Sequence, residues 1–361
     1  MAEGRDPSPR RRAEEFAEAL GIRLPILLAP MAGFSAPSLS IALANAGGMG
    51  ACGALPMQPQ EIVQWADEVR TGTPGPFQIN LWIPEPPPKR DPELEKAQRD
   101  FQAKWGPPVA PEAGDAKLVD FDSQFRAILD VGPKAISSIM GVYRRALVAE
   151  LKARRILWLA TATTIDEAKQ AEEAGADAII AQGAEAGGHR GAFDSEKAVQ
   201  QAAGLVALLP PMVDAVNVPV IAAGGIADGR GVAAALILGA SAVQIGTGFL
   251  RCPEAKVHPA YADRLARTGP DDTMLTRAFS GRPGRSAATA YVRAANAPDA
   301  PPPTPYPVQR GLTRAMRDDA QRRGDADRMQ LWAGQAARLA PARPAGEFAR
   351  ELWDKASQFL P

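Results

Sequence analysis

Short apolar runs alternate with stretches of helical periodicity from Leu24 to Leu250. The runs lack the in-and-out alternation of a half-exposed strand, which is typical of parallel strands covered on both faces. We therefore expect an α/β protein. The expected strands are Pro25–Pro30, Gly48–Gly53, Phe77–Trp82, Ala135–Met140, Ile156–Thr161, Ala178–Gly183, Val218–Gly225 and Ala242–Gly248.

Several of these runs follow a helix that ends in Ala-Gly or Gly-Ala, as in "ALANAGGMGACG", "AEEAGADAIIAQG" and "ALILGASAVQIGTG". Glycine commonly ends a helix in the left-handed conformation and lets the chain turn back to a sheet. Eight such units predict a (β/α)8 TIM barrel, with a doubly wound open sheet as the alternative. No G-x-G-x-x-G follows the first run, which disfavours a Rossmann dinucleotide site.

Three regions lie outside this repeat. Residues 1–23 form a charged N-terminal segment with helical character, and a proline-rich insertion of about residues 84–117 follows the third strand. Residues 256–361 read as a helical C-terminal extension. We expect a TIM barrel over residues 24–255 with the extension packed on it.

Composition narrows the possible partners. The 41 Lys and Arg balance 41 Asp and Glu, so no net field attracts nucleic acid or an anionic membrane, and a small neutral or singly charged ligand fits better. The two cysteines show neither a disulfide framework nor a metal-type spacing, and no apolar stretch reaches the ~20 residues of a membrane span. We expect a cytoplasmic protein with buried cysteines and without a metal site, either a monomer or a homo-oligomer.

Two glycine-rich loops follow the last two expected strands. TIM barrels often hold phosphate in these two loops. Gly224 and Gly225 would let backbone N–H groups approach a phosphate, and Gly246 and Thr247 offer a second cluster with a hydroxyl donor. Tight turns are the alternative explanation for each glycine pair.

His189 is one of only two histidines and lies after the sixth expected strand, at the same end of the barrel as the glycine loops. Imidazole titrates near neutrality and is a common general base, so we favour a catalytic role over a structural one. The neighbouring Glu185 and Arg190 could fix the loop as an ion pair or contact substrate. Tyr306 in the extension could reach the mouth of the barrel or face solvent.

Five segments together point to a known family: "LLAPMAGFS", "AQGAEAGGHRGAF", "VPVIAAGGIADGRGVAAALILGASAVQIGTGFL", "TRAFSGRPGR" and "LWAGQAARL". From Leu24 to about Leu339 the chain resembles the nitronate monooxygenases, formerly called 2-nitropropane dioxygenases. The resemblance implies a TIM barrel with non-covalent FMN that uses dioxygen to oxidise alkyl nitronates to a carbonyl compound and nitrite, with nitroalkanes as a further candidate substrate.

The resemblance also implies roles for individual residues. Pro30 and Met31 would line the flavin ring, Asn80 and Gln182 would hydrogen-bond to it, Gly187 and Gly188 would lie beside it, and Gly224, Gly225, Gly246 and Thr247 would hold its phosphate. His189 would remove the Cα proton of a nitroalkane or orient the nitronate anion.

Other functions remain open at this point. An FMN-dependent NAD(P)H reductase of quinones or of the enoyl-acyl-carrier-protein type would share a similar glycine-histidine loop. A flavin-free barrel that binds a sugar phosphate, or a non-catalytic binding protein, are further alternatives. The segments "MGACGALPMQPQEI" and "SSIMG" and the proline-rich insertion depart from better-known family members, and we expect them to shape the substrate pocket.

Overall fold

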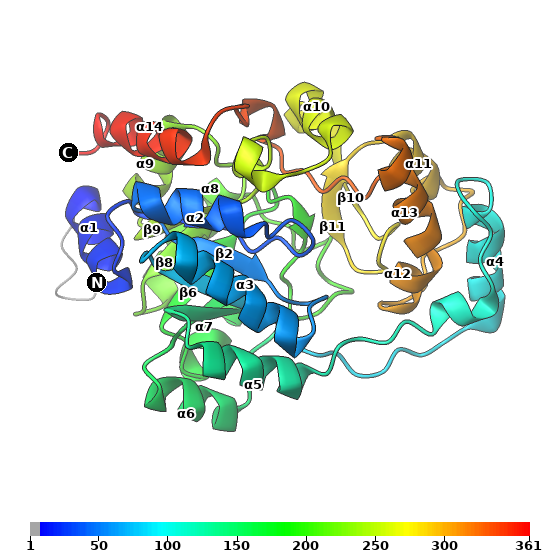
Figure 1. The fold of residues 1–361 in the computed structure, drawn as a ribbon, viewed down its shortest axis with the longest axis horizontal. Helices are drawn as coiled ribbons and strands as arrows, with labels where there is room; N and C mark the ends of the chain where they lie inside the picture. Colours follow the sequence, from blue (N-terminus) through cyan, green and yellow to red (C-terminus); the bar gives the residue numbers. More distant parts are fainter. Residues whose placement is uncertain (1–7) are drawn as a thin grey trace.

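Eight parallel strands form one sheet in the computed structural model, which describes residues 8–361 (Figure 1). The strands are β1 Ile26–Leu28, β2 Gly50–Gly53, β3 Phe77–Trp82, β4 Ala135–Ile139, β5 Leu157–Ala162, β6 Ala178–Gln182, β8 Val220–Ala223 and β9 Ala242–Ile245. Their order is β1-β9-β8-β6-β5-β4-β3-β2. A parallel bridge between Leu27 and Met49 joins the two ends, so the sheet closes. The eight expected strands and the TIM barrel are confirmed, and the open sheet is wrong.

Helices surround the barrel in the expected alternation. They are α2 Pro37–Ala46, α3 Pro59–Gly72, α5 Phe121–Val131, α6 Arg145–Ala153, α7 Ile165–Glu173, α8 Leu205–Ala215 and α9 Gly229–Ile237. Gly47 ends α2 at φ 107°, as the recurring helix-end glycines predict.

The eighth outer helix comes from the far end of the chain. No long helix follows β9 directly; instead α14, Ala345–Ser357, lies against both α9 and α2 (Figure 1). Its buried residues include Phe348, whose ring lies 5.2 Å from that of Phe249. The extension therefore completes the ring of helices, and the expected division of the chain at residues 23 and 255 remains a prediction.

Helix α1, Pro9–Leu20, covers the opposite end of the barrel from the glycine loops. Ala17 and Leu20 on its buried face pack with barrel residues that include Leu27 and Ile180. The first seven residues of the predicted N-terminal segment lie outside the described residues.

The insertion and the extension lie side by side (Figure 1). The insertion holds α4, Pro92–Gln102, and a short 3-10 helix η1, Pro111–Gly114; the extension holds α11 Ala290–Ala295, α12 Val308–Leu312 and α13 Arg314–Arg323. Gln98 Nε2 donates to the Pro301 carbonyl at 2.8 Å, and Gln102 Nε2 to the Tyr291 hydroxyl at 2.8 Å. The insertion is thus anchored on the extension.

The rest of the extension lies near the carboxyl ends of the barrel strands. Two short 3-10 helices, η2 Thr247–Phe249 and η3 Pro253–Ala255, precede it, and it contains α10 Pro259–Arg267, η4 Pro270–Asp272, β10 Thr273–Thr276, β11 Gly284–Ala287 and η5 Ala337–Leu339. Strands β10 and β11 form a three-stranded antiparallel sheet with β7, Gly188–His189, from the loop after β6. This sheet ties the loop of His189 to the extension.

Two expectations from composition concern cysteine and the membrane. Cys52 and Cys252 are free and buried, as expected, and burial raises the pKa of each thiol to about 12. Within residues 8–361 no helix is both long and apolar enough to span a bilayer. The same residues contain no cluster of three or more His, Cys, Asp or Glu that could hold a metal.

Candidate active site

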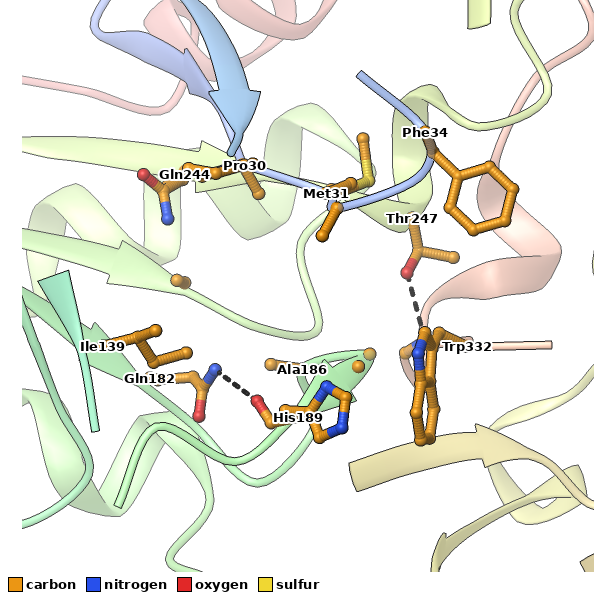
Figure 2. Close-up of a pocket in the computed structure, with 18 of the residues that line it drawn as sticks. Pro30, Met31, Phe34, Ile139, Gln182, Ala186, His189, Gln244, Thr247 and Trp332 are labelled. Atoms are coloured by element: carbon orange, nitrogen blue, oxygen red, sulfur yellow. Dashed lines mark hydrogen bonds between the residues drawn. The ribbon is translucent and has the colours of Figure 1, made fainter. Parts of the chain in front are cut away.

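One pocket at the carboxyl ends of the barrel strands collects every residue that the sequence proposed for the site. These are Pro30, Met31, Asn80, Gln182, Gly187, Gly188, His189, Gly224, Gly225, Gly246 and Thr247. Figure 2 shows Pro30 and Met31 on one side of this pocket, Gln182 on another, and His189 beside Trp332. Residues from β1, β3, β6, β8 and β9 thus meet in one space, because parallel strands in a barrel end on the same face.

The two glycine loops present free backbone donors. Among the hydrogen bonds of the described residues, none uses the N–H of Gly224, Gly225 or Thr247. Gly224 has φ 113°, and a Cβ there would lie 3.0 Å from the Ala186 nitrogen. The N-terminus of α9 follows this loop and adds a positive end. These groups could hold an anion such as a phosphate.

Gly187 lies where the barrel meets the extension. A Cβ on Gly187 would lie 2.5 Å from the Gly334 nitrogen and 2.8 Å from Thr247 Oγ1. Gly334 N in turn donates to Thr247 Oγ1 at 3.1 Å (Figure 2). The absence of a side chain at Gly187 is therefore required by close packing between three chain segments.

Three side-chain amides line the pocket. Asn80 donates from Nδ2 to the Ser137 carbonyl at 3.2 Å, which leaves its Oδ1 to accept. Gln182 is used twice in holding the histidine loop, since Nε2 donates to the His189 carbonyl at 3.1 Å and Oε1 accepts from the Gly191 nitrogen at 2.8 Å. Gln244, which sequence reasoning missed, accepts from Gln78 and keeps its own amide N–H groups for a ligand.

His189 is held between aromatic rings and a serine. Its ring lies 4.7 Å from that of Trp82 and 4.8 Å from that of Trp332. Its Nε2 lies 2.7 Å from Ser280 Oγ. Strand β11 pairs with its backbone, opposite Gly284. The imidazole is thus fixed by packing on two sides, a hydrogen bond, and a short strand.

The surroundings of His189 disfavour its protonated form. Burial, and secondarily the positive charges of Arg282, Arg310 and Arg317, lower its pKa to about 3. A pKa this low leaves the imidazole neutral at neutral pH and makes it a weaker base than a free histidine. The positive charges that produce part of this shift would attract an anion.

Glu185 and Arg190 fix the loop, but not as a pair. Arg190 is 1% exposed and donates to the carbonyls of Gly183 and Gln182 at 2.6 and 3.2 Å. Glu185 accepts from the Leu205 nitrogen at 2.9 Å. No ion pair joins Glu185 to Arg190 in the described part of the chain. The ion pair, one of the two roles considered for these residues, is wrong; each residue instead holds the loop through its own hydrogen bonds to the backbone.

The extension supplies residues that sequence reasoning did not assign to the site. Ser280, Tyr306, Arg310, Gln330 and Trp332 all line the pocket. Of these, only Tyr306 was considered, and the structure places it inside the pocket rather than in solvent. Two segments that carry the family resemblance could have identified Ser280 and Trp332. "TRAFSGRPGR" contains Ser280, and "LWAGQAARL" contains Trp332.

Comparison with characterised proteins agrees with this architecture. A family model described as nitronate monooxygenase matches residues 14–355. The chain is 40% identical over 345 residues to a nitronate monooxygenase of Pseudomonas aeruginosa, covering 94% of this chain and 98% of the relative. It is 39% identical over 332 residues to a probable nitronate monooxygenase of Bacillus subtilis, covering 90% and 93%.

Two solved structures share the fold over nearly the whole chain. A nitroalkane oxidase from Streptomyces ansochromogenes superposes with a TM-score of 0.86 at 37% identity, over 95% of this chain and 98% of that one. FabK from Thermotoga maritima superposes with a TM-score of 0.73 at 28% identity, over 95% and 96%. This chain belongs to the nitronate monooxygenase family and is a flavin-dependent monooxygenase.

Proposed function

We propose that this protein uses FMN and dioxygen to oxidise alkyl nitronates to carbonyl compounds and nitrite, and that His189 orients the anion. The observation that carries the proposal is a neutral imidazole held rigidly in a pocket whose nearby cations, Arg282, Arg310 and Arg317, favour negative charge.

The pocket residues fit FMN in three respects. The free N–H groups of Gly224, Gly225 and Thr247 suit a phosphate. The carbonyl of the Asn80 amide and the N–H groups of Gln244 suit the donors and acceptors on the polar edge of a flavin. Apolar side chains such as Met31 and Ile139 would lie against its rings (Figure 2).

The charge of the site distinguishes two substrates. A nitroalkane is neutral and must lose a Cα proton first, whereas a nitronate has already lost it and carries a negative charge. A base with a pKa of about 3 removes such a proton poorly, because general-base catalysis is best when the pKa lies near the operating pH. The structure therefore favours orientation of the nitronate over proton abstraction, the two roles considered for His189.

The side chains of the pocket would position the substrate and exclude water. Trp82 and Trp332 flank the imidazole, so a planar nitronate would meet an apolar wall with one polar edge at His189. Arg310 lines the same pocket and would partly neutralise the anion. When bound, the flavin supplies the electron transfer between nitronate and dioxygen.

The test compares ethyl nitronate with nitroethane. Wild-type enzyme with bound FMN should have a much higher kcat/KM for the nitronate, and nitroethane turnover should show no rise near pH 6.5. His189→Asn should retain FMN and raise KM for the nitronate more than it lowers kcat. Faster turnover of nitroethane than of ethyl nitronate by wild type, with a pH profile that rises near 6.5, would instead assign proton abstraction to His189.

An NAD(P)H reductase is the second candidate, since such an enzyme would share a similar glycine-histidine loop, here Gly187–His189. Anaerobic mixing separates the two functions. We expect ethyl nitronate to reduce the bound flavin faster than NADPH or NADH does. The opposite ranking would move the assignment to the reductase.

A further inference from the structure

A second cavity of about 530 Å³ lies next to the first pocket, between the insertion and the ends of β3 and β4. This volume is within the range of about 300–1,000 Å³ that is usual for small-molecule sites. Its apolar lining consists of Leu55, Trp82, Ile83, Pro84, Leu118, Val119, Phe121, Met140, Val142, Tyr143 and Leu147.

Most polar side chains around this cavity already have partners. Glu85 forms an ion pair with Arg282, and Asp122 forms one with Arg144. Gln124 donates to the carbonyls of Ala54 and Met57. The Tyr306 hydroxyl, on the wall shared with the first pocket, has no hydrogen-bond partner among the described residues. Because the two ion pairs neutralise their charges, the cavity favours a hydrocarbon chain over a charged ligand.

The two spaces share a wall made of Leu55, Trp82 and Tyr306. The Trp82 ring lies 4.7 Å from that of His189 on one side and 5.4 Å from that of Tyr306. A substrate whose charged end lies at His189 is therefore separated from the second cavity by the thickness of one side chain.

Three segments expected to shape the substrate pocket each contribute to the wall of this cavity. Leu55 belongs to "MGACGALPMQPQEI", Met140 to "SSIMG", and Pro84 to the proline-rich insertion. Met140 has φ 70°, a left-handed conformation that is rare for a side chain of this size. Most of the remaining wall comes from residues 118–124 and 142–147.

We propose that the second cavity binds the hydrocarbon chain of the substrate, so that the preferred nitronates carry an apolar chain of several carbons. The inference rests on the proposed function, since it places the charged end at His189. A short nitronate would occupy the first pocket alone, and a longer one would pass Trp82 and bury its chain beside Met140 and Val142.

The test uses two series of ligands with the FMN-loaded protein. Primary alkyl nitronates from ethyl to octyl give kcat/KM, and the unreactive carboxylates from propionate to nonanoate, which are also planar anions, give Kd by calorimetry. Each methylene that enters the cavity should tighten carboxylate binding about fourfold, the equivalent of ~0.8 kcal/mol per buried CH₂. We expect kcat/KM for the nitronates to rise over the same lengths.

Two variants and one control locate the effect. Val142→Phe narrows the cavity, and Leu118→Trp does so at a position that is 47% exposed and so tolerates a larger side chain. Both should lower the affinity for octanoate at least tenfold and leave propionate binding and ethyl nitronate turnover unchanged. Val206→Phe is the control, because it enlarges a valine side chain in the same way on α8, where that side chain is 71% exposed. It should change neither the carboxylate affinities nor the kcat/KM values of the nitronates.

The outcomes separate the two proposals. Equal affinities along the carboxylate series, or a chain-length dependence that both cavity variants preserve, would overturn the second site. If no nitronate of any length is oxidised, the proposed function fails, whereas the carboxylate series still decides whether the cavity binds a chain.

Discussion

The depressed pKa of His189 makes the stability of the protein depend on pH in a way that can be assigned to one residue. In the unfolded chain this histidine takes up a proton as the pH falls through its ordinary value of about 6.5. In the folded protein it stays neutral until about pH 3. The stabilisation is therefore fully present above pH 6.5 and is lost as the pH falls below it.

The magnitude follows from how far the pH falls below the pKa of about 6.5 in the unfolded chain, as long as it stays above the pKa in the folded protein. One pKa unit corresponds to about 1.4 kcal/mol, so between pH 7 and pH 5 wild type should lose at most about 2 kcal/mol of unfolding free energy through this group. His189→Asn has nothing to titrate there. The sequence contains only one other histidine, His258, which both proteins share and whose contribution cancels in the comparison.

The assay is urea unfolding of wild type and His189→Asn at pH 7, 6 and 5 in the same excess of FMN. The difference in unfolding free energy between the two proteins should change by up to about 2 kcal/mol in favour of the variant as the pH falls. Parallel pH profiles would refute the reasoning, because they would mean that the imidazole titrates in the folded protein as it does in the unfolded chain.

Two further predictions concern the phosphate loops and the last helix. Gly224→Val should lower flavin content, measured by absorbance after reconstitution, far more than activity per bound flavin, because a β-branched residue at φ 113° would displace the loop; unchanged flavin content would place the phosphate elsewhere. Leu352→Ala on α14, where the side chain is 2% exposed, should cost about 2–5 kcal/mol of unfolding free energy. Phe359→Ala, 56% exposed, is its control and should change stability by less than about 0.5 kcal/mol; equal effects of both substitutions would mean that α14 does not close the ring of helices.

The sequence predicted the parts of the site that depend on local pattern. Several strand ends were marked by an apolar run followed by glycine or a polar residue, as at Gln182 and Gly224, and the barrel fold brings such ends to one face. Trp332 and Ser280 could not be found in this way, because nothing local indicates that residues 91 to 143 positions after His189 pack against its ring. The lowered pKa was also not predictable, since it arises from burial and from arginines brought near by tertiary folding.

The position of α14 also bears on how the protein is made. A ribosome delivers β1 and α2 long before α14, although α2 and α14 are neighbours in the finished ring. Until α14 emerges, the apolar faces that α9 and α2 present to it lack their partner. The nascent chain therefore exposes an open seam for most of its synthesis, a period in which chaperone binding would protect it from aggregation. A premature stop before residue 345 would leave that seam permanently open, even though every barrel strand and His189 had been translated.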